Sequence, residues 1–514
     1  MAVSRMTHAK RNIKSAAVIK LITPITSFVT RTALIYSLGS VYLGLNSLFT
    51  SMLQVLSLAE LGFGSAMVFS LYKPMAEEDH VTVCALLRLY RRIYRIIGSV
   101  ILGVGLILIP FLPHLIKGSV PDGMNLTVLY LIRLADTSVS YFLFSYRSAL
   151  LDASQQKRVF YNIHTIAKIA TCVLQITLLM LFKNYYMFSV VQPLIQVGIN
   201  LAIWRATQRK FPQYQCAGDL PKEAVRDIGK RVAGLFLFKV SHVLRNSFDS
   251  IILSAFLGLD ILAKYQNYLL IVTTLVGITA VLTDSTLSSV GNSVAMESKE
   301  KNYRDFRSFQ LMFMWLVGCI SVCMCCLYQP FIRLWIGESN MLSDRLMLVF
   351  VVYFFTERMG NICYQYRQAT GLWWEDRIRP LVDGAVNLTL NYFLVQYIGI
   401  AGVMLSTILC QVFIDSVWSS HLLFRCYFTE WKQKSYLGRL LIFAAATAAG
   451  CGVSILLCRF IPESGSNILI TFLWMAVRGV ICVAVSNAIF FPVYRLLPEF
   501  QDAKRSVRKL LKRA

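Results

Sequence analysis

One sixteen-residue stretch occurs twice in this chain, and its first copy reads Arg31-Thr-Ala-Leu-Ile-Tyr-Ser-Leu-Gly-Ser-Val-Tyr-Leu-Gly-Leu-Asn46. The second copy, at an offset of 214 residues and without a gap, reads Arg245-Asn-Ser-Phe-Asp-Ser-Ile-Ile-Leu-Ser-Ala-Phe-Leu-Gly-Leu-Asp260. Each copy begins inside an apolar segment and ends at a glycine-containing turn. The pattern predicts a duplicated helical unit with an arginine inside its first helix.

The composition indicates a membrane protein. Of the 514 residues, 56% are hydrophobic and only 15% are charged, whereas a soluble globular protein carries about 25% charged residues. Apolar segments recur that are long enough to cross a bilayer core of about 30 Å. The formal net charge of +24 is expected of basic cytoplasmic loops, so we expect no nucleic-acid partner.

The sequence predicts an all-α polytopic protein with about fourteen transmembrane helices. The expected spans are 15–38, 46–72, 96–116, 124–146, 159–182, 185–204, 233–256, 265–290, 308–330, 346–366, 380–397, 400–424, 440–458 and 467–494. With the N-terminus inside, the inside segments hold 37 of the 51 Lys and Arg residues and the outside loops hold six. This asymmetry is the positive-inside signature, and it predicts that both termini are cytoplasmic.

The repeat also predicts the domain organisation. A second matching pair, Phe111–Gly118 and Tyr328–Gly337, lies at offsets of 217 to 219 residues. We therefore expect two six-helix bundles that enter the membrane in the same direction, as parallel repeats do in some transporters. The predicted parts are an N-terminal lobe (1–210), a cytoplasmic linker (211–232), a C-terminal lobe (233–431), two extra spans (432–495) and a tail (496–514).

The C-terminal tail combines apolar residues at helical spacing with several lysines and arginines. This pattern is typical of a helix that lies on an anionic membrane surface. Anionic lipids are therefore expected partners, and the alternative is a solvated basic tail. Nothing in the sequence indicates an oligomer, so we expect a monomer.

Four basic residues are candidates for an anion-binding cavity, because a charged side chain within a span normally faces protein or water. Arg31 has no acidic residue within one helical turn, and Arg245 is its counterpart in the repeat. Lys239 precedes Arg245 in the same span, and Arg133 lies in the fourth span. Guanidinium groups suit a diphosphate because they offer several donors in one plane.

Three acidic residues are candidates for ion coupling, namely Glu60, Asp249 and Asp284. An alternative applies to some of the charges, because Arg245 and Asp249 are four residues apart and Arg133 and Asp136 are three apart. Residues at these spacings share one helix face, so each pair could neutralise itself within its helix.

Catalytic and cofactor motifs are lacking. The thirteen cysteines follow no metal-ligand spacing, and they are interpreted as small packing residues rather than disulfides or metal ligands. The sequence contains no Walker A loop, Gly-rich nucleotide fingerprint or HExxH motif. We therefore expect no metal, no cofactor and no enzymatic activity.

Several runs resemble bacterial polysaccharide (oligosaccharide) flippases, the Wzx-like branch of the MOP exporter superfamily. They are Tyr42-Leu-Gly-Leu-Asn46, Leu58-Ala-Glu-Leu-Gly-Phe-Gly64, Tyr265-Gln-Asn-Tyr268, Pro330-Phe-Ile-Arg-Leu-Trp-Ile-Gly337 and Gly399-Ile-Ala-Gly-Val403. The resemblance covers nearly the whole chain, although each run is a weak motif by itself. It implies a MATE-like fold in which two lobes surround a cationic central cavity.

The resemblance also implies a function. The protein would carry an undecaprenyl-diphosphate-linked oligosaccharide from the inner to the outer leaflet of the bacterial cytoplasmic membrane, by alternating access, for surface polysaccharide synthesis. Polysaccharide polymerases and glycosyltransferases would be its partners. Two alternatives remain: an ion-coupled drug or cation exporter of the same fold, and a membrane polysaccharide polymerase or ligase.

Overall fold

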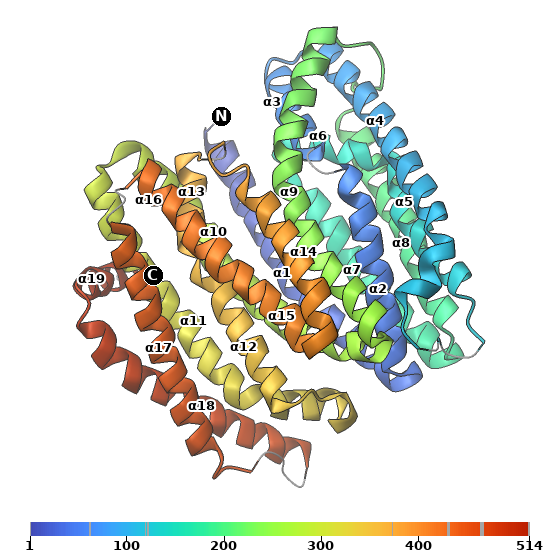
Figure 1. Cartoon of the computed structure of the whole chain (residues 1–514). Coiled ribbons are helices and arrows are strands. Elements are labelled where there is room, and N and C mark those ends of the chain that lie inside the picture. The colour runs from blue at the N-terminus through green and yellow to red at the C-terminus, as the bar shows by residue number, and fades with distance from the viewer. Residues whose placement is uncertain are drawn as a thin grey trace. The chain divides into compact units, whose positions relative to one another are not determined.

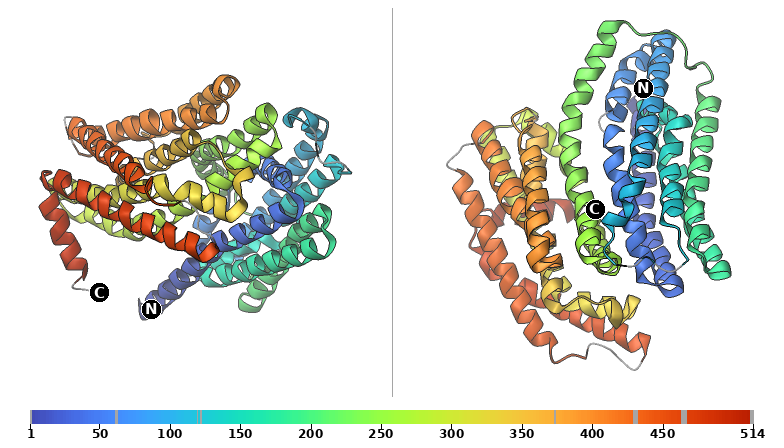
Figure 2. Two further views of the ribbon diagram at one scale, coloured as in Figure 1. Left: turned by 90° about the horizontal axis from the view of Figure 1, so that it is seen from below. Right: turned by 45° about the vertical axis from the view of Figure 1, so that its right-hand side comes forward.

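The computed structural model describes residues 2–60, 63–118, 120, 123–372, 374–428, 432–462 and 467–511. Within these ranges, the side chains of residues 2–10, 13, 14, 59, 230, 231, 233–242, 244–246, 288 and 506–511 lie outside the description. The described chain consists of helices and turns and contains no strand (Figures 1 and 2). The chain divides into two compact units, Met1–Ala263 and Lys264–Ala514.

The first unit contains the N-terminal half of the helices. They are α1 (Ala2–Leu38), α2 (Ser40–Leu56), η1 (Ser57–Glu60), α3 (Phe63–Ala76), α4 (His80–Ile107), η2 (Ile109–Leu115), α5 (Leu126–Phe142), η3 (Phe144–Arg147), α6 (Ser148–Ala153), α7 (Lys157–Phe182), α8 (Tyr185–Lys210) and α9 (Lys222–Leu257). The main packing pairs are α1 with α7, α7 with α8, α5 with α8, and α2 with α9.

The second unit begins within α10 (Leu259–Met296). It continues with α11 (Lys299–Ile336), η4 (Glu338–Asn340), α12 (Asp344–Met359), α13 (Asn361–Thr370), α14 (Arg379–Ile398), α15 (Ile400–Leu409), η5 (Cys410–Trp418), α16 (Ser419–Cys426), α17 (Lys432–Cys458), α18 (Ile468–Arg495) and α19 (Phe500–Leu511). The segment η5 is a π-helix. Helices α17 and α18 pack against α11 and against each other (Figure 1).

Side-chain caps fix where several helices begin. The carboxylate of Asp79 accepts a hydrogen bond from the backbone N–H of Thr82 at 3.0 Å at the start of α4. Asn125 and Asn467 accept equivalent bonds at the starts of α5 and α18. Such caps satisfy N–H groups that have no partner inside the helix. At the other end, α11, α13 and α14 stop at glycines with positive φ, which glycine adopts without strain.

The structure supports a polytopic membrane protein. Nine helices in the described residues are long and apolar enough to cross a membrane, or eleven if the two bent pairs, α4 with η2 and α5 with the segment from Phe144 to Ala153, each form one span. The three other expected spans are also helical. The span 46–72 is broken between α2 and α3, 233–256 lies in α9, and 380–397 lies in α14 and contains buried polar residues.

The helix ends correct the register of the repeat. Gly39, with φ 106° and ψ 167°, separates α1 from α2, and Gly258, with φ 91° and ψ 173°, separates α9 from α10. These two breaks are 219 residues apart, as are the positive-φ residues Gly118 and Gly337. The offset of 214 is therefore wrong in structural terms, since it pairs Gly258 with Gly44 inside α2.

The corrected register places Arg31 and Arg245 at different heights. Arg31 comes eight residues before its glycine break and Arg245 thirteen residues before its own. At a rise of about 1.5 Å per residue, the two Cα atoms are roughly 12 and 20 Å from their breaks. The two arginines are consequently not equivalent positions, although both lie in the first helix of a repeat.

The predicted domain limits stay a prediction. The second lobe was expected to begin at residue 233, whereas the first compact unit runs to Ala263, because α9 packs against α2 and α3. The predicted linker contains a short non-helical segment between α8 and α9, and α9 itself begins at Lys222.

Candidate functional site

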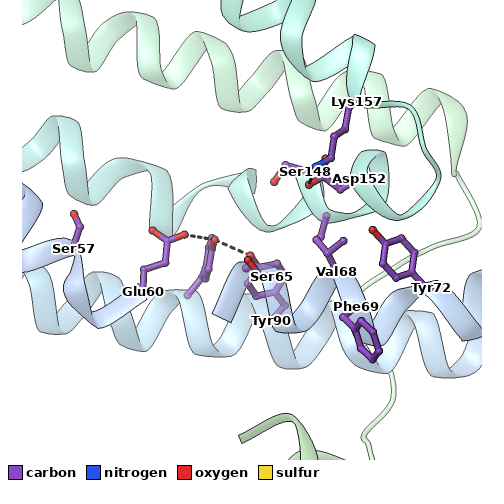
Figure 3. A pocket seen from close by; sticks show the side chains of 13 residues that line it. Ser57, Glu60, Ser65, Val68, Phe69, Tyr72, Tyr90, Ser148, Asp152 and Lys157 are labelled. Carbon is purple, nitrogen blue, oxygen red and sulfur yellow. Dashed lines mark hydrogen bonds and ion pairs between the residues drawn. The ribbon is translucent and has the colours of Figure 1, made fainter. Parts of the chain in front are cut away.

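A pocket of about 590 Å³ lies within the first unit (Figure 3). Its walls come from η1, α3, α4, α6 and the first residue of α7. Its polar lining residues are Ser57, Glu60, Ser65, Tyr90, Tyr94, Ser148, Asp152 and Lys157. Among the described residues that line it, Glu60 is the one that the sequence predicted for ion coupling.

Glu60 reaches the pocket because the expected second span is interrupted. Helix α2 ends at Leu56, the tight turn η1 carries Glu60, and α3 begins at Phe63. Irregular backbone at membrane depth is tolerated where it is buried in protein or lines a cavity. Gly64 opens the wall beside it, because a Cβ there would lie only 3.3 Å from the hydroxyl of Tyr90.

Three tyrosines order the carboxylate. The hydroxyl of Tyr94 donates to Oε1 of Glu60 at 2.5 Å, and that of Tyr141 donates to Oε2 at 2.5 Å. Tyr90 in turn donates to the hydroxyl of Tyr94 at 2.7 Å, and Figure 3 shows this chain from Glu60 to Tyr90. Both carboxylate oxygens of Glu60 therefore receive a hydrogen bond from a tyrosine hydroxyl.

The tyrosine rings also pack on one another, which holds the hydroxyl groups in place. Tyr90 and Tyr94 are four residues apart on α4 with ring centroids at 4.4 Å, and Tyr94 meets Tyr141 of α5 at 5.4 Å. Because the rings come from two helices, the donors are positioned by packing as well as by their bonds to Glu60. A preorganised carboxylate of this kind can hold a cation or a proton.

The other end of the pocket carries an ion pair. Lys157 Nζ lies 3.2 Å from Oδ2 of Asp152, and both side chains are partly exposed. Figure 3 shows this pair across the pocket from Val68 and Tyr72. Phe69 and Tyr72 are exposed aromatic side chains of α3 in the same lining. The pocket thus has the carboxylate of Glu60 at one end, and exposed aromatic side chains with an ion pair at the other.

Arg133 occupies a separate polar cluster in the first unit. Its side chain is 5% exposed. One guanidinium nitrogen donates to Oε1 of Gln192 on α8 at 3.1 Å, and another donates to the side-chain oxygen of Asn46 on α2. Both acceptors are neutral amides, and Arg133 also interacts electrostatically with Asp136 on its own helix.

The alternative of an internal pair with Asp136 stays a prediction for Arg133. The two charges interact electrostatically, while the hydrogen bonds of the guanidinium join α5 to α2 and α8. A spacing of three residues puts both side chains on one helix face, but the neighbouring helices offer the arginine closer acceptors. Its Nε has no hydrogen-bond partner in the described part of the chain.

The structure disperses the other predicted residues. Arg31 is half-buried on α1, Asp249 is 6% exposed on α9, and Asp284 is exposed on α10 in the second unit. Lys239 and Arg245 lie in α9, but their side chains are outside the described residues. The pairing of Arg245 with Asp249 and the cationic cavity are therefore still predictions.

Sequence reasoning missed the three tyrosines around Glu60. Tyr90 and Tyr94 lie in the basic run that the charge pattern assigned to the cytoplasmic side, and Tyr141 lies in the following span. The signal that could have found the first two is their spacing of four residues, which puts both hydroxyl groups on one face of α4. Tyr141 could not be linked to Glu60 without knowledge of how α4 packs on α5.

The second unit contains a buried ion network that was also missed. Asp376 accepts from Arg379 Nε at 2.7 Å and contacts Arg367 Nη1 at 2.9 Å, and Arg379 also pairs with Asp415 of η5. Arg367, Asp376 and Arg379 are each at most 6% exposed. Asp415 of η5 thus has a structural role as a partner of Arg379.

Comparison with known proteins gives structural matches only. No protein-family model and no curated protein sequence matches this chain. An inward-facing structure of a multidrug resistance MATE family transporter of the MOP superfamily is 16% identical, with a TM-score of 0.61, over 78% of this chain and 97% of that one. A mutant of the Vibrio cholerae MATE transporter VcmN is 14% identical, with a TM-score of 0.55, over 82% and 97%.

The lipid II flippase MurJ in an inward closed conformation also matches. It is 15% identical with a TM-score of 0.66, and the alignment covers 94% of this chain and 98% of the flippase. These likenesses show that the chain has the fold of MOP superfamily transporters, as the sequence predicted, and that it is a multi-pass membrane protein.

Proposed function

We propose that this protein is a flippase that moves an undecaprenyl-diphosphate-linked oligosaccharide from the inner to the outer leaflet of the bacterial cytoplasmic membrane. The observation that carries the proposal is the extent of the likeness to the lipid II flippase, which includes more of this chain than the likenesses to the two MATE transporters do. The sequence runs that resemble Wzx-like flippases support the same class of substrate.

The basic residues of the membrane helices support an anionic substrate. Arg133 is buried and its hydrogen bonds go to two neutral amides, so we propose that its charge attracts an incoming diphosphate. A buried charge of this kind costs free energy, and an anionic headgroup would compensate it. Arg31, Lys239 and Arg245 are proposed to act in the same way from α1 and α9, at two different heights.

The Glu60 pocket is proposed to supply ion coupling. In the expected topology, Tyr72, Asp152 and Lys157 lie near cytoplasmic segments, and Glu60 lies deeper in the second span. A cation or proton from the cytoplasm would therefore reach an ordered carboxylate through the pocket. Asp249 and Asp284 are further proposed positions for ion coupling.

The remaining elements of the proposal concern location and partners. We place the protein in the bacterial cytoplasmic membrane with both termini inside, as a monomer, beside the polymerases and glycosyltransferases of a polysaccharide pathway. Helix α19 supports contact with anionic lipids, because Lys504 and Arg505 are exposed whereas Ala503 is 4% exposed. Catalysis is not part of the proposed role.

The test compares Arg31→Ala and Arg133→Ala with Arg88→Ala in cells that lack the native gene. Arg88 is an exposed arginine paired with Asp219, so its loss is expected to leave transport unchanged. Removing a charge-assisted contact of about 1.5–3 kcal/mol lowers substrate affinity roughly tenfold or more. We expect the first two variants, at normal protein levels, to accumulate a lipid-linked oligosaccharide on the inner leaflet and to lose surface polysaccharide.

Normal surface polysaccharide in both variants, with no accumulated intermediate, would contradict the proposed role of these arginines. Absence of any lipid-linked intermediate in the deletion strain itself would contradict the flippase function. The accumulated molecule, identified by mass spectrometry, would also define the sugar repeat unit.

A second candidate function is export of organic cations, and the Glu60 pocket is the observation that favours it. A carboxylate combined with exposed aromatic rings is a suitable site for a cation, through charge and cation–π attraction. Cells that express the protein would then expel a cationic dye, and Glu60→Gln would abolish the efflux. The flippase proposal expects no dye efflux in either case.

A further inference from the structure

Three cysteines from three helices meet in the second unit. They are Cys326 of α11, Cys458 at the end of α17 and Cys482 of α18, and their Sγ atoms all lie within 4.8 Å of one another. Their side chains are 5%, 4% and 0% exposed. The residues are separated by 132 and 24 positions in the sequence, which is why no metal-ligand spacing is visible there.

We propose that these three cysteines form a binding site for a soft, thiophilic metal ion. Thiolate sulfur is the ligand that soft ions such as Cu(I), and the borderline ion Zn²⁺, prefer over hard oxygen ligands. The cluster contains no carboxylate or histidine, so it does not suit Ca²⁺ or Mg²⁺.

The geometry is close to that of a three-coordinate site. A metal–sulfur distance of about 2.3 Å places three sulfurs in a trigonal plane roughly 4.0 Å apart. The observed distances between the Sγ atoms are at most 4.8 Å, so a shift of less than 1 Å in each sulfur position would let all three sulfurs bond one metal ion. Cys323 on α11 also contacts Cys482, which offers a fourth sulfur nearby.

The charge balance involves Arg478. Binding of a divalent ion releases one proton from each of the three thiols, so the ion with its three thiolates carries one negative charge. Arg478 of α18 is 5% exposed, donates to the backbone oxygen of Cys326 at 3.4 Å, and interacts electrostatically with Cys458. Its guanidinium can therefore neutralise the complex inside the helix bundle.

The bound ion would cross-link three helices that already pack together. Helices α17 and α18 contact α11 and each other, and a metal at this point would join all three through strong bonds. Because an ion that binds only the folded state stabilises it, the site would fix the last two spans to the rest of the second unit.

Purified full-length protein in detergent, reduced and then freed of reductant, would be titrated with Cd²⁺ as the probe. Bound cadmium per protein would be measured after desalting, together with the ultraviolet charge-transfer band of cadmium thiolate. The variants are Cys482→Ser and Cys458→Ser, and the matched control is Cys363→Ser, which removes a thiol that is also fully buried in the second unit but lies outside the cluster.

Wild type and Cys363→Ser are expected to bind one Cd²⁺ and to gain several degrees in unfolding temperature. Both cluster variants are expected to lose the bound ion and the gain. Equal cadmium binding by the cluster variants and wild type would overturn the proposal, as would absence of binding to reduced wild type. If one variant fails to fold, the other still decides, because Cys458 lies at the end of its helix. A native disulfide among the three cysteines would also overturn it.

Discussion

At the scale of single residues, the sequence identified Glu60 but not its environment. A carboxylate inside an otherwise apolar span is rare enough to mark a candidate from sequence alone. The three tyrosine donors come from two helices, α4 and α5, and sequence spacing cannot show which helices are neighbours. For the same reason the hydrogen-bond acceptors of Arg133 on α2 and α8 were not predicted.

Glu60→Gln is expected to reduce gradient-dependent transport at least tenfold, because the amide cannot carry the negative charge that holds a cation. Tyr141→Phe removes one hydrogen bond to the carboxylate, worth about 1.5–3 kcal/mol, and is expected to have a smaller effect in the same direction. The measurement is substrate flipping in reconstituted vesicles with and without an imposed ion gradient.

The matched control is Glu77→Gln. Glu77 is an exposed carboxylate near the end of α3, 3.9 Å from Lys73, and exposed pairs of this kind contribute little. Transport by Glu60→Gln that still responds fully to the gradient, with Glu77→Gln behaving identically, would exclude Glu60 from coupling.

At the scale of helices, apolar length and charge predicted the elements well. Every one of the fourteen expected ranges is helical over most of its described length. Two features escaped prediction: the break of the second span at η1, and the five-residue error in the repeat register. The register error arose because the Leu-Gly-Leu match drew the alignment to Gly44, whereas the helix break is at Gly39.

Gly44 nevertheless has a strict role in helix packing. A Cβ at this position would lie 2.0 Å from the backbone oxygen of Leu259, so α2 and the first turn of α10 approach too closely for any side chain. We expect Gly44→Ala to destabilise the protein by about 1–3 kcal/mol through overpacking. Thermal unfolding of the purified protein in detergent measures the effect.

Gly103→Ala on α4 is the control for this prediction, because no atom lies within 4 Å of the position a Cβ would take. Alanine favours a helix over glycine by up to about 1 kcal/mol, so this variant is expected to be unchanged or slightly more stable. Equal unfolding temperatures for the two variants would mean that the close approach of α2 to α10 does not occur.

At the scale of the whole molecule, composition and charge asymmetry predicted the class of fold and the topology. The class is confirmed by the likeness to MOP superfamily transporters, and the orientation stays a prediction. The sugar and the driving ion could not be predicted, because recognition by scattered polar side chains leaves no linear motif, and the cationic cavity stays a prediction. The thiol cluster escaped for a related reason, since its members are far apart in the sequence.

The predicted topology can be checked by labelling with a membrane-impermeant maleimide. Cys426 is exposed and lies in an expected inside segment, whereas Ser339 is exposed in an expected outside loop. In intact cells we expect label at the new thiol of Ser339→Cys and none at Cys426, and the reverse in inverted vesicles. Mass spectrometry of the labelled peptides locates each label. The predicted topology has three spans between the two positions, which places them on opposite sides of the membrane. Label at both positions from the same side would contradict this topology.

The π-helical turn at Cys410–Trp418 has an evolutionary consequence for the second unit. A π-helical turn carries one more residue than the regular α-helix around it, so deleting a single residue here would convert the turn to α-helix without interrupting the continuous helix. Because the π-helical turn already contains the extra residue, this deletion would leave the rotational phase downstream nearly unchanged, and Ser419, which accepts from Arg367 at 2.9 Å, would keep its donor. A single deletion in the regular helix beside it would instead rotate everything downstream by about 100° and would carry Ser419 away from Arg367. The π-helical turn is thus the place where this helix tolerates a change of one residue in length.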